Sequence, residues 1–375
     1  MRIAIVHDWL KVYSGAESTL SAMLEVFPQA DLFSLVDFLP SQYRKKILDK
    51  KVKTSFIQKL PFAKKMYRHY LPLMPIAVEQ FDMSSYDLVI SSTHAVAKGV
   101  VVGPGQLHIC MCYSPIRYAW DLSHQYLRES GLKKGLKGIL AKFMLHKIRI
   151  WDARTANGVD EFIAISHFIK QRINKIYRRD STVIYPPVNI DDFTLCEYKE
   201  DYYVTVSRFV PYKKIDMIVK AFALMPEKKL IVIGDGPDFK KVDSIKSANV
   251  QLMGYLPLNI LREKIQKAKA FIFAAIEDFG IAPLEAQACG TPVIGYAKGG
   301  LLETITSETG MFFYDQTPQS IAETIKEFEK KSHEFSPKKC RENALRFSHE
   351  NFKIKFNDFV MRHIHDYEGI NSCRR

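Results

Sequence analysis

The chain of 375 residues is 47% apolar and 25% charged, with a net charge of +13, which is ordinary for a globular protein with sizeable cores apart from its basic balance. Its length suggests two domains. No apolar run approaches the roughly 18 residues of a membrane-spanning helix, and the stretch from Met1 to Asp8 lacks the layout of a signal peptide, so we expect a cytoplasmic protein without a transmembrane segment.

Short apolar runs alternate with longer amphipathic runs, which is typical of parallel βα units. In the first half we expect strands at Ile3–Val6, Leu32–Leu35, Leu88–Ser91, Val100–Val102, Ile109–Cys112 and Glu161–Ile165. In the second half we expect strands at Tyr203–Ser207, Lys229–Ile233, Val250–Met253, Ala270–Ala274, Pro292–Gly295 and Met311–Tyr314. Expected helices include Ile215–Leu224, Leu258–Lys267 and Gln319–Lys330.

These two series predict an α/β protein with two doubly wound parallel sheets. Proline restricts the backbone and disfavours helix before it, so Tyr185-Pro186-Pro187 is a natural linker. We therefore place one domain at residues 1–185 and the other at 186–351, with a C-terminal helix at about 352–375 packing back onto the first. Ligands of such sheets bind beyond the carboxyl ends of the strands, and two facing domains would form a cleft.

Two basic segments stand out in the first half. Between Tyr43 and His69, ten lysines and arginines are opposed only by Asp49, and apolar side chains are interleaved with them. A similar segment runs from Lys133 to Arg149. Such segments suit an anionic membrane surface, with an ordinary solvated surface as the alternative. We do not expect nucleic acid as a partner, because no nucleic-acid-binding motif accompanies the charge.

The strongest sign of chemistry is the segment from Glu277 to Glu285, which follows the expected strand Ala270–Ala274. Pro283 suits the first turn of a helix, which would put Glu277 on the strand-to-helix loop and Glu285 in that first turn. Gly280 would let the backbone approach a ligand closely. Two carboxylates that accept hydrogen bonds from hydroxyl groups suit a sugar and a ribose, and a surface loop with ordinary acidic residues is the alternative.

A second sign lies after the first strand of the second domain. Arg208 and Lys213 follow that strand at its carboxyl end, where phosphates bind in such sheets. Arginine offers a planar fork of donors and lysine a point charge, and together they could neutralise a diphosphate leaving group. The alternative is an ordinary solvated pair. The six cysteines have no metal-ligand spacing and no Asp-x-Asp motif follows a strand, so we expect reduced thiols, no metal and no other cofactor.

With these motifs in place, the chain resembles the retaining glycosyltransferases of two Rossmann-like domains, the GT-B fold, that carry a Glu-x7-Glu motif and form glycosyltransferase family 4. The resemblance spans essentially the whole chain and is clearest in the second domain. Five motifs carry it in matching order: Ser207 to Lys214, Ile233 to Pro237, Gly254 to Leu256, Glu277 to Glu285 and Gly299 to Glu303.

The resemblance implies a donor site in the second domain and an acceptor site in the first. Arg208 and Lys213 would hold the donor diphosphate, and Glu285 the ribose hydroxyls. The transferred sugar would be held by Glu277 with the backbone of Phe279, Gly280 and Ile281, and the base would lie near Gly254 and Tyr255. In the first domain, Gly15 lies in a loop like the family's glycine-containing loop, with Ser14 where a second glycine is usual, and would let the backbone approach the phosphate or the acceptor.

A further segment, from Met111 to Asp121, is similar to one in bacterial mannosyltransferases that build O-antigen or exopolysaccharide. It implies acceptor contacts by Tyr113, Arg117 and Asp121, the last two being equally able to form a structural ion pair instead. Many relatives have histidine where Tyr113 stands, and tyrosine cannot serve as the same near-neutral acid or base. His94 could supply an imidazole to the site, or be a local loop histidine.

The resulting hypothesis is a retaining hexosyltransferase that uses GDP-mannose and a polyprenyl-diphosphate-linked oligosaccharide at the inner face of the cytoplasmic membrane, in O-antigen or polysaccharide synthesis. Arg208, Lys213, Glu277 and His94 are its expected catalytic residues. Other polysaccharide-assembly transferases are expected as further partners. The alternatives are a transferase that uses a UDP sugar, a sugar-nucleotide epimerase, and a non-catalytic scaffold.

Overall fold

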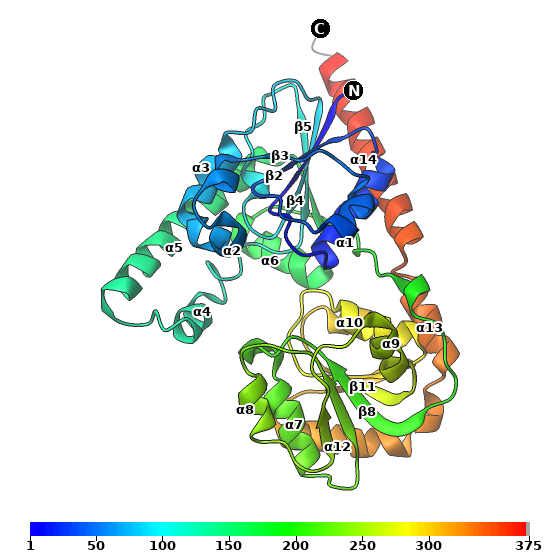
Figure 1. Ribbon diagram of the computed structural model, residues 1–375. Coiled ribbons are helices and arrows are strands. Elements are labelled where there is room, and N and C mark those ends of the chain that lie inside the picture. Colours follow the sequence, from blue (N-terminus) through cyan, green and yellow to red (C-terminus); the bar gives the residue numbers. More distant parts are fainter. Residues whose placement is uncertain (373–375) are drawn as a thin grey trace. The chain divides into compact units, whose positions relative to one another are not determined.

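The computed structural model describes residues 1–372, with side chains as far as Tyr367. The chain divides into two compact units, each built on its own sheet (Figure 1). Unit 1 comprises Met1–Pro187 together with the chain from Phe352 onward, and unit 2 comprises Val188–Asn351. Cys373 and the end of the helix expected at 352–375 lie outside the described residues.

Unit 1 contains a seven-stranded parallel sheet in the order β3-β2-β1-β4-β5-β6-β7. The strands are β1 Ile3–His7, β2 Asp31–Ser34, β3 Lys53–Thr54, β4 Leu88–Thr93, β5 Leu107–Cys112, β6 Glu161–Ala164 and β7 Thr182–Val183. The helices are α1 Gly15–Val26, α2 Ala63–Met66, α3 Met74–Glu79, α4 Ser123–Glu129, α5 Gly135–Thr155, α6 His167–Tyr177 and α14 His349–Ser372, with 3-10 turns η1 Ser41–Ile47, η2 Phe56–Lys59, η3 Tyr67–Leu73, η4 Ala97–Gly99 and η5 Ala156–Gly158.

The middle of this sheet is the most apolar part of unit 1. Every residue of β1, β4 and β5 is buried, as expected for strands covered on both faces. α14 packs on this unit: the rings of Phe356 and Phe27 lie 6.1 Å apart, and the Tyr367 hydroxyl donates to the carbonyl of Pro104 at 2.8 Å. Because β1, β4 and β5 are neighbours in a parallel sheet, their carboxyl ends lie side by side.

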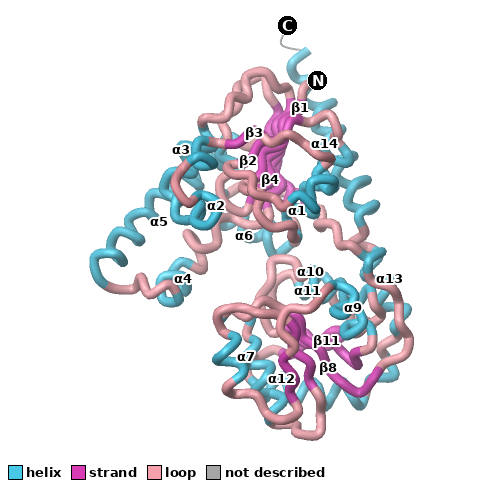
Figure 2. The backbone as a smooth tube through the Cα atoms, in the orientation of Figure 1, coloured by secondary structure: helices cyan, strands magenta, loops and turns pink. Residues whose placement is uncertain are grey.

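Unit 2 contains a six-stranded parallel sheet in the order β10-β9-β8-β11-β12-β13, drawn in magenta in Figure 2. Its strands are β8 Glu200–Val206, β9 Leu230–Ile233, β10 Val250–Leu252, β11 Ala268–Phe273, β12 Val293–Tyr296 and β13 Gly310–Phe313. Its helices are α7 Ile215–Ala223, α8 Phe239–Asp243, α9 Leu258–Gln266, α10 Ile281–Ala288, α11 Leu301–Thr304, α12 Pro318–Lys330 and α13 Pro337–Leu345, with 3-10 turns η6 Ile190–Asp192, η7 Pro211–Lys213 and η8 Ser332–Glu334.

A large aromatic and aliphatic core underlies this second sheet. Phe209, Phe222, Phe313 and Phe328 are all at most 1% exposed and belong to one cluster. The chain enters and leaves unit 2 at neighbouring points, because Val188 and Ser348 form an isolated parallel bridge and the Val188 N–H donates to the carbonyl of Phe347 at 2.9 Å.

The expected strand at Val100–Val102 is wrong. The segment follows η4 as irregular chain, with Val100 buried in the core and Val101 60% exposed. Both edges of β4 are already paired with β1 and β5, so the sheet offers this segment no place beside β4. The other expected strands are present with shifted ends, and the short edge strands β3 and β7 were missed.

Candidate functional site

In unit 2 the candidate donor residues follow the strands at the carboxyl edge of the sheet. The loops after β8, β9 and β10 are tied together by the backbone: the Phe209 N–H donates to the carbonyl of Asp235 at 2.9 Å, and the Gly234 N–H to that of Gly254 at 2.8 Å. Gly234 has a φ of +134°, and a Cβ there would lie 1.9 Å from the Ser207 carbonyl oxygen. Only glycine allows this close approach.

The two predicted motifs meet through one ion pair. Lys213 lies at the end of η7, and its ammonium contacts the carboxylate of Glu277, which stands on the loop after β11 as predicted. Both side chains are largely buried, at 19% and 17% exposure. Arg208 lies on the same loop as Lys213 and is exposed to solvent. A cation held by a carboxylate, with an exposed guanidinium on the same loop, is an arrangement that can receive a diphosphate and a sugar hydroxyl.

The segment after Glu277 turns into α10 through Gly280, whose φ is +103°. Phe279 is buried with its ring 5.5 Å from that of Phe347, so its backbone is the part left to meet a ligand, and Ile281 is the first residue of the helix. Glu285 lies in the second turn of α10, not in the first as expected, because the helix begins at Ile281, two residues before Pro283.

Glu285 has an unusual protonation equilibrium. Burial, with the nearby negative charge of Asp192, raises its pKa from 4.5 to about 7, and Arg262 opposes the rise. The carboxyl group can thus change its charge near neutral pH. On the loop after β10, Gly254 has a φ of +66° and Tyr255 is 86% exposed, so this aromatic ring is open to a ligand.

In unit 1 the most elaborate arrangement surrounds Asp8, a residue that the sequence analysis did not single out. Asp8 directly follows β1 and is fully buried. Its carboxylate accepts hydrogen bonds from the backbone N–H groups of residues 94–97, at 2.6 to 2.9 Å, and from the Thr93 hydroxyl at 3.1 Å. Although burial favours the neutral form, His94 and these N–H groups hold the pKa of Asp8 below its ordinary value.

His94, a predicted catalytic residue, is oriented by that carboxylate. Its Nδ1 lies 3.1 Å from Asp8 Oδ2, and its ring packs edge-on against Trp9 at 4.6 Å. Burial lowers the pKa of His94, with Asp8 acting against this. A neutral imidazole that donates from Nδ1 to Asp8 has Nε2 as its acceptor. One feature of the sequence could have identified Asp8: it is a charged residue directly after an apolar strand, as Arg208 is.

Tyr113 and Gly15 lie beside this pair at the same edge. Gly15 begins α1 behind the N-cap Ser14, whose N–H and hydroxyl donate to Glu17 at 3.1 and 2.8 Å. Tyr113 is 9% exposed, its hydroxyl donates to the carbonyl of Ala16 at 3.2 Å, and Ser92 lies 2.8 Å from it. Burial raises its pKa, so the phenol stays neutral and joins the first turn of α1 to β4.

The remaining predicted acceptor residues belong to the turn after β5. Asp121 is exposed and forms an ion pair with Arg172 of α6, which also donates to the Ser114 hydroxyl at 3.1 Å. Arg117 is half-buried, and its carbonyl accepts the N–H of Leu122 at 3.1 Å. Asp121 therefore forms a structural ion pair with Arg172, whereas the pair left open from the sequence was one between Arg117 and Asp121.

Residues 190–347 match the family Glycosyl transferases group 1. The chain is 32% identical over 134 residues to a GDP-mannose-dependent monoacylated alpha-(1-6)-phosphatidylinositol monomannoside mannosyltransferase of Corynebacterium glutamicum, covering 32% of this chain and 35% of that protein. It is also 32% identical over 143 residues to the O-antigen chain mannosyltransferase RfbU of Salmonella typhimurium, covering 35% and 40%. The matches thus span well under half the length of these two relatives.

Solved structures resemble the chain over nearly its whole length. A UDP complex of HepE from Anabaena has a TM-score of 0.70 at 17% identity and covers 96% of this chain and 100% of its own. Sucrose-phosphate synthase from Thermosynechococcus elongatus has a TM-score of 0.75 at 16% identity, covering 98% and 100%. The two parallel sheets are those of the GT-B fold. Within residues 1–372, none of the helices has the length and apolarity needed to span a bilayer.

Proposed function

Residues 190–347 form a domain of the glycosyl transferases group 1 family, and on this premise we propose that the chain is a retaining hexosyltransferase. Its donor is GDP-mannose, and its acceptor is a lipid-linked oligosaccharide at the cytoplasmic side of a membrane, in the synthesis of O-antigen or a related polysaccharide. Unit 2 binds the donor and unit 1 the acceptor. The proposal needs no metal, because cationic side chains serve the diphosphate.

The observation that carries the proposal is the contact between Lys213 and Glu277 at the carboxyl edge of the sheet of unit 2. The donor exchanges this ion pair for two new contacts: Lys213 and Arg208 take the diphosphate, and Glu277 takes a sugar hydroxyl. Glu285 accepts hydrogen bonds from the ribose. If the pair of Lys213 and Glu277 only stabilised the fold, it would not require an exposed guanidinium on the same loop or a helix that begins at Gly280 close by in sequence.

In the proposed reaction the bond between the anomeric carbon and the diphosphate oxygen breaks, and a bond to the acceptor hydroxyl oxygen forms on the same face. A donor phosphate oxygen takes the proton of that hydroxyl. Arg208 and Lys213 stabilise the negative charge that develops on the leaving diphosphate. His94, fixed by Asp8, holds a neutral imidazole for hydrogen bonding to the sugar or acceptor.

Mannose is the proposed sugar because two curated relatives at 32% identity are named as mannosyltransferases, one of them GDP-mannose-dependent. The O-antigen relative also supports a lipid-linked acceptor. The structures solved with UDP share the fold at 16–17% identity and leave the base open, so a UDP-sugar donor is the alternative within the same function.

Thermal-shift binding of GDP, UDP, GDP-mannose and UDP-glucose tests the donor site. We expect a shift with the GDP compounds, lost in Arg208→Ala and Glu285→Ala and kept in Lys220→Ala, which removes an exposed cation from α7. A shift with UDP compounds alone would replace mannose by another sugar. The absence of any shift in the wild type would contradict the transferase and leave the scaffold alternative.

A further inference from the structure

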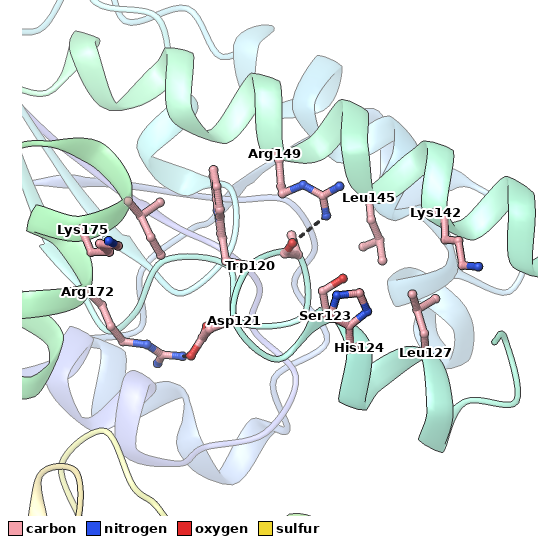
Figure 3. Close-up of a pocket in the computed structure, with 12 residues that line it drawn as sticks. Trp120, Asp121, Ser123, His124, Leu127, Lys142, Leu145, Arg149, Arg172 and Lys175 are labelled. Atoms are coloured by element: carbon pink, nitrogen blue, oxygen red, sulfur yellow. Dashed lines mark hydrogen bonds and ion pairs between the residues drawn. The ribbon is translucent and has the colours of Figure 1, made fainter.

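A pocket of about 630 Å³ lies within unit 1, away from the residues assigned above except for Asp121. It is bounded by the turn after β5 and by helices α4, α5 and α6 (Figure 3). Its volume is in the range of pockets that enclose small organic ligands. The lining residues used below are Trp120, Leu127, Lys142, Leu145, Arg149 and Lys175.

The polar lining of the pocket is mostly cationic, with Asp121, Ser123 and His124 as its other polar members. Lys142 and Arg149 are seven residues apart on α5 and so share one face of that helix, and Lys175 comes from α6. Among the described residues, none of these three has a carboxylate within ion-pair distance: Lys142 contacts the carbonyl of Lys133 at 3.2 Å and Arg149 that of Ala119 at 2.9 Å. The single acid of the lining, Asp121, is engaged by Arg172.

The positive charges of Lys142, Arg149 and Lys175 favour binding of an anion that has several oxygen atoms. Three cations from two helices line one cavity, with Arg149 half-buried and Lys142 and Lys175 exposed, so a ligand with at least two negative charges can contact more than one of them. A diphosphate provides such a ligand, and the arginine fork suits its oxygens. Figure 3 shows Arg149 and Lys142 on α5, with Lys175 on α6 across the turn that carries Trp120 and Asp121.

The pocket also has an apolar part, formed by Ala119, Trp120, Leu127, Leu145 and Ile176. Leu127 and Leu145 are buried at 5% and 4% exposure, and the indole N–H of Trp120 donates to Asp152 at 2.6 Å, which fixes the ring. A hydrated inorganic anion gains nothing from such walls, whereas a ligand that joins a phosphate group to a hydrocarbon chain uses both parts of the lining.

The helix that supplies two of the cations also carries an unusual exposed apolar group. Leu136, Ile139, Leu140 and Phe143 are 86, 64, 61 and 53% exposed, and their spacing of three and four residues gathers them along one side of the helix. α5 runs outward from the body of unit 1 (Figure 1). Lysines 133, 134, 137 and 147 surround this group, a combination that suits a lipid surface with anionic heads.

We propose that the pocket between α4, α5 and α6 binds the diphosphate group of a membrane-borne amphiphile, with the exposed apolar group of α5 resting on the lipid beside it. The inference rests on the proposed function, in which this amphiphile is the acceptor. It assigns to Lys142, Arg149 and Lys175 a second diphosphate site, separate from Arg208 and Lys213.

The test is calorimetric titration of the full chain with farnesyl diphosphate, a soluble isoprenoid diphosphate, and with inorganic diphosphate. We expect farnesyl diphosphate to bind more tightly than inorganic diphosphate. Removing two charge-assisted contacts in Lys142→Gln/Lys175→Gln should weaken it by about tenfold or more. The matched control Lys326→Gln/Lys330→Gln makes the same charge change at two exposed lysines of α12, in unit 2 and outside both the pocket and the apolar group of α5, and should stay within about twofold.

Two outcomes would overturn the inference. Equal weakening in the pocket and control variants would mean a general charge effect, and equal affinity for farnesyl and inorganic diphosphate would exclude an amphiphile. GDP binding separates this inference from the proposed function. A chain that binds GDP but shows no pocket-dependent farnesyl diphosphate binding refutes the pocket alone, whereas pocket-dependent binding without any nucleotide binding refutes the donor site and leaves the pocket supported.

Discussion

The raised pKa of Glu285 has a measurable effect on stability. Its folded-state pKa of about 7 lies above the ordinary 4.5, so the folded protein binds this proton more tightly than the unfolded chain does. The contribution to stability is full below the unfolded pKa and is lost as the pH rises from about 4.5 to about 7. A difference of this size corresponds to at most about 3 kcal/mol.

Glu285→Gln removes the charge and nearly preserves the shape, so it is the decisive perturbation. At about pH 5 the folded carboxyl group is neutral while the unfolded one is mostly ionised, so the variant should be more stable by less than about 1 kcal/mol, whereas at about pH 8 it should be more stable by up to about 3 kcal/mol. Thermal unfolding reports this, since about 2–4 °C accompanies each kcal/mol in a domain of this size.

The control for this measurement is Glu323→Gln, which neutralises an exposed glutamate of α12 in the same unit. It should leave the difference between the two pH values unchanged. If Glu285→Gln changes the unfolding temperature equally at both pH values, the carboxyl group is ionised throughout and our reasoning about its burial is refuted. The same variant should still lose nucleotide binding, because an amide replaces a carboxylate acceptor for the ribose.

Three further predictions concern two buried carboxylates and one glycine. Asp8→Asn puts an N–H₂ group against backbone N–H donors and should cost about 2–3 kcal/mol in urea unfolding, a loss absent if the carboxylate does not accept these bonds. Asp152→Ala strands the buried ammonium of Lys98, 2.6 Å from it, at a cost of about 3–5 kcal/mol. Lys98→Met/Asp152→Asn removes the ammonium and keeps an amide oxygen for the donors Trp120 and Tyr177, so it should be less destabilised than Asp152→Ala, and an equal loss would argue against a stranded charge. Gly234→Ala forces a Cβ onto a carbonyl oxygen and should weaken nucleotide binding about tenfold or more, as titration with GDP would show.

The positions of most strands were predictable, because a buried parallel strand appears in the sequence as a short run of apolar residues. The exceptions have physical reasons. Val100 and Val101 are as apolar as a strand, but pairing depends on a free sheet edge, which local sequence does not reveal. The strands β3 and β7 are two residues long, and a run of this length has no periodicity to detect.

The candidate donor residues were chosen for their position after strands, and the structure brings Lys213 and Glu277 together from segments 64 residues apart in sequence. The surroundings of Asp8 were not predictable, because four of its partners are backbone N–H groups, which every residue type supplies. The pocket lined by Lys142 and Lys175 was equally hidden, since the basic segment indicated charge without indicating a cavity.

Because Val188 and Ser348 are paired by a β-bridge, unit 2 is a continuous segment whose two ends lie together. The two ends of one continuous segment are fastened to each other by the backbone, independently of the side chains that line the donor site. A related unit with the same paired ends can therefore be spliced in at these two points while the seven-stranded sheet and α14 stay intact. Under the proposed function, such an exchange would replace the unit proposed to bind the donor and leave unchanged the unit proposed to bind the acceptor.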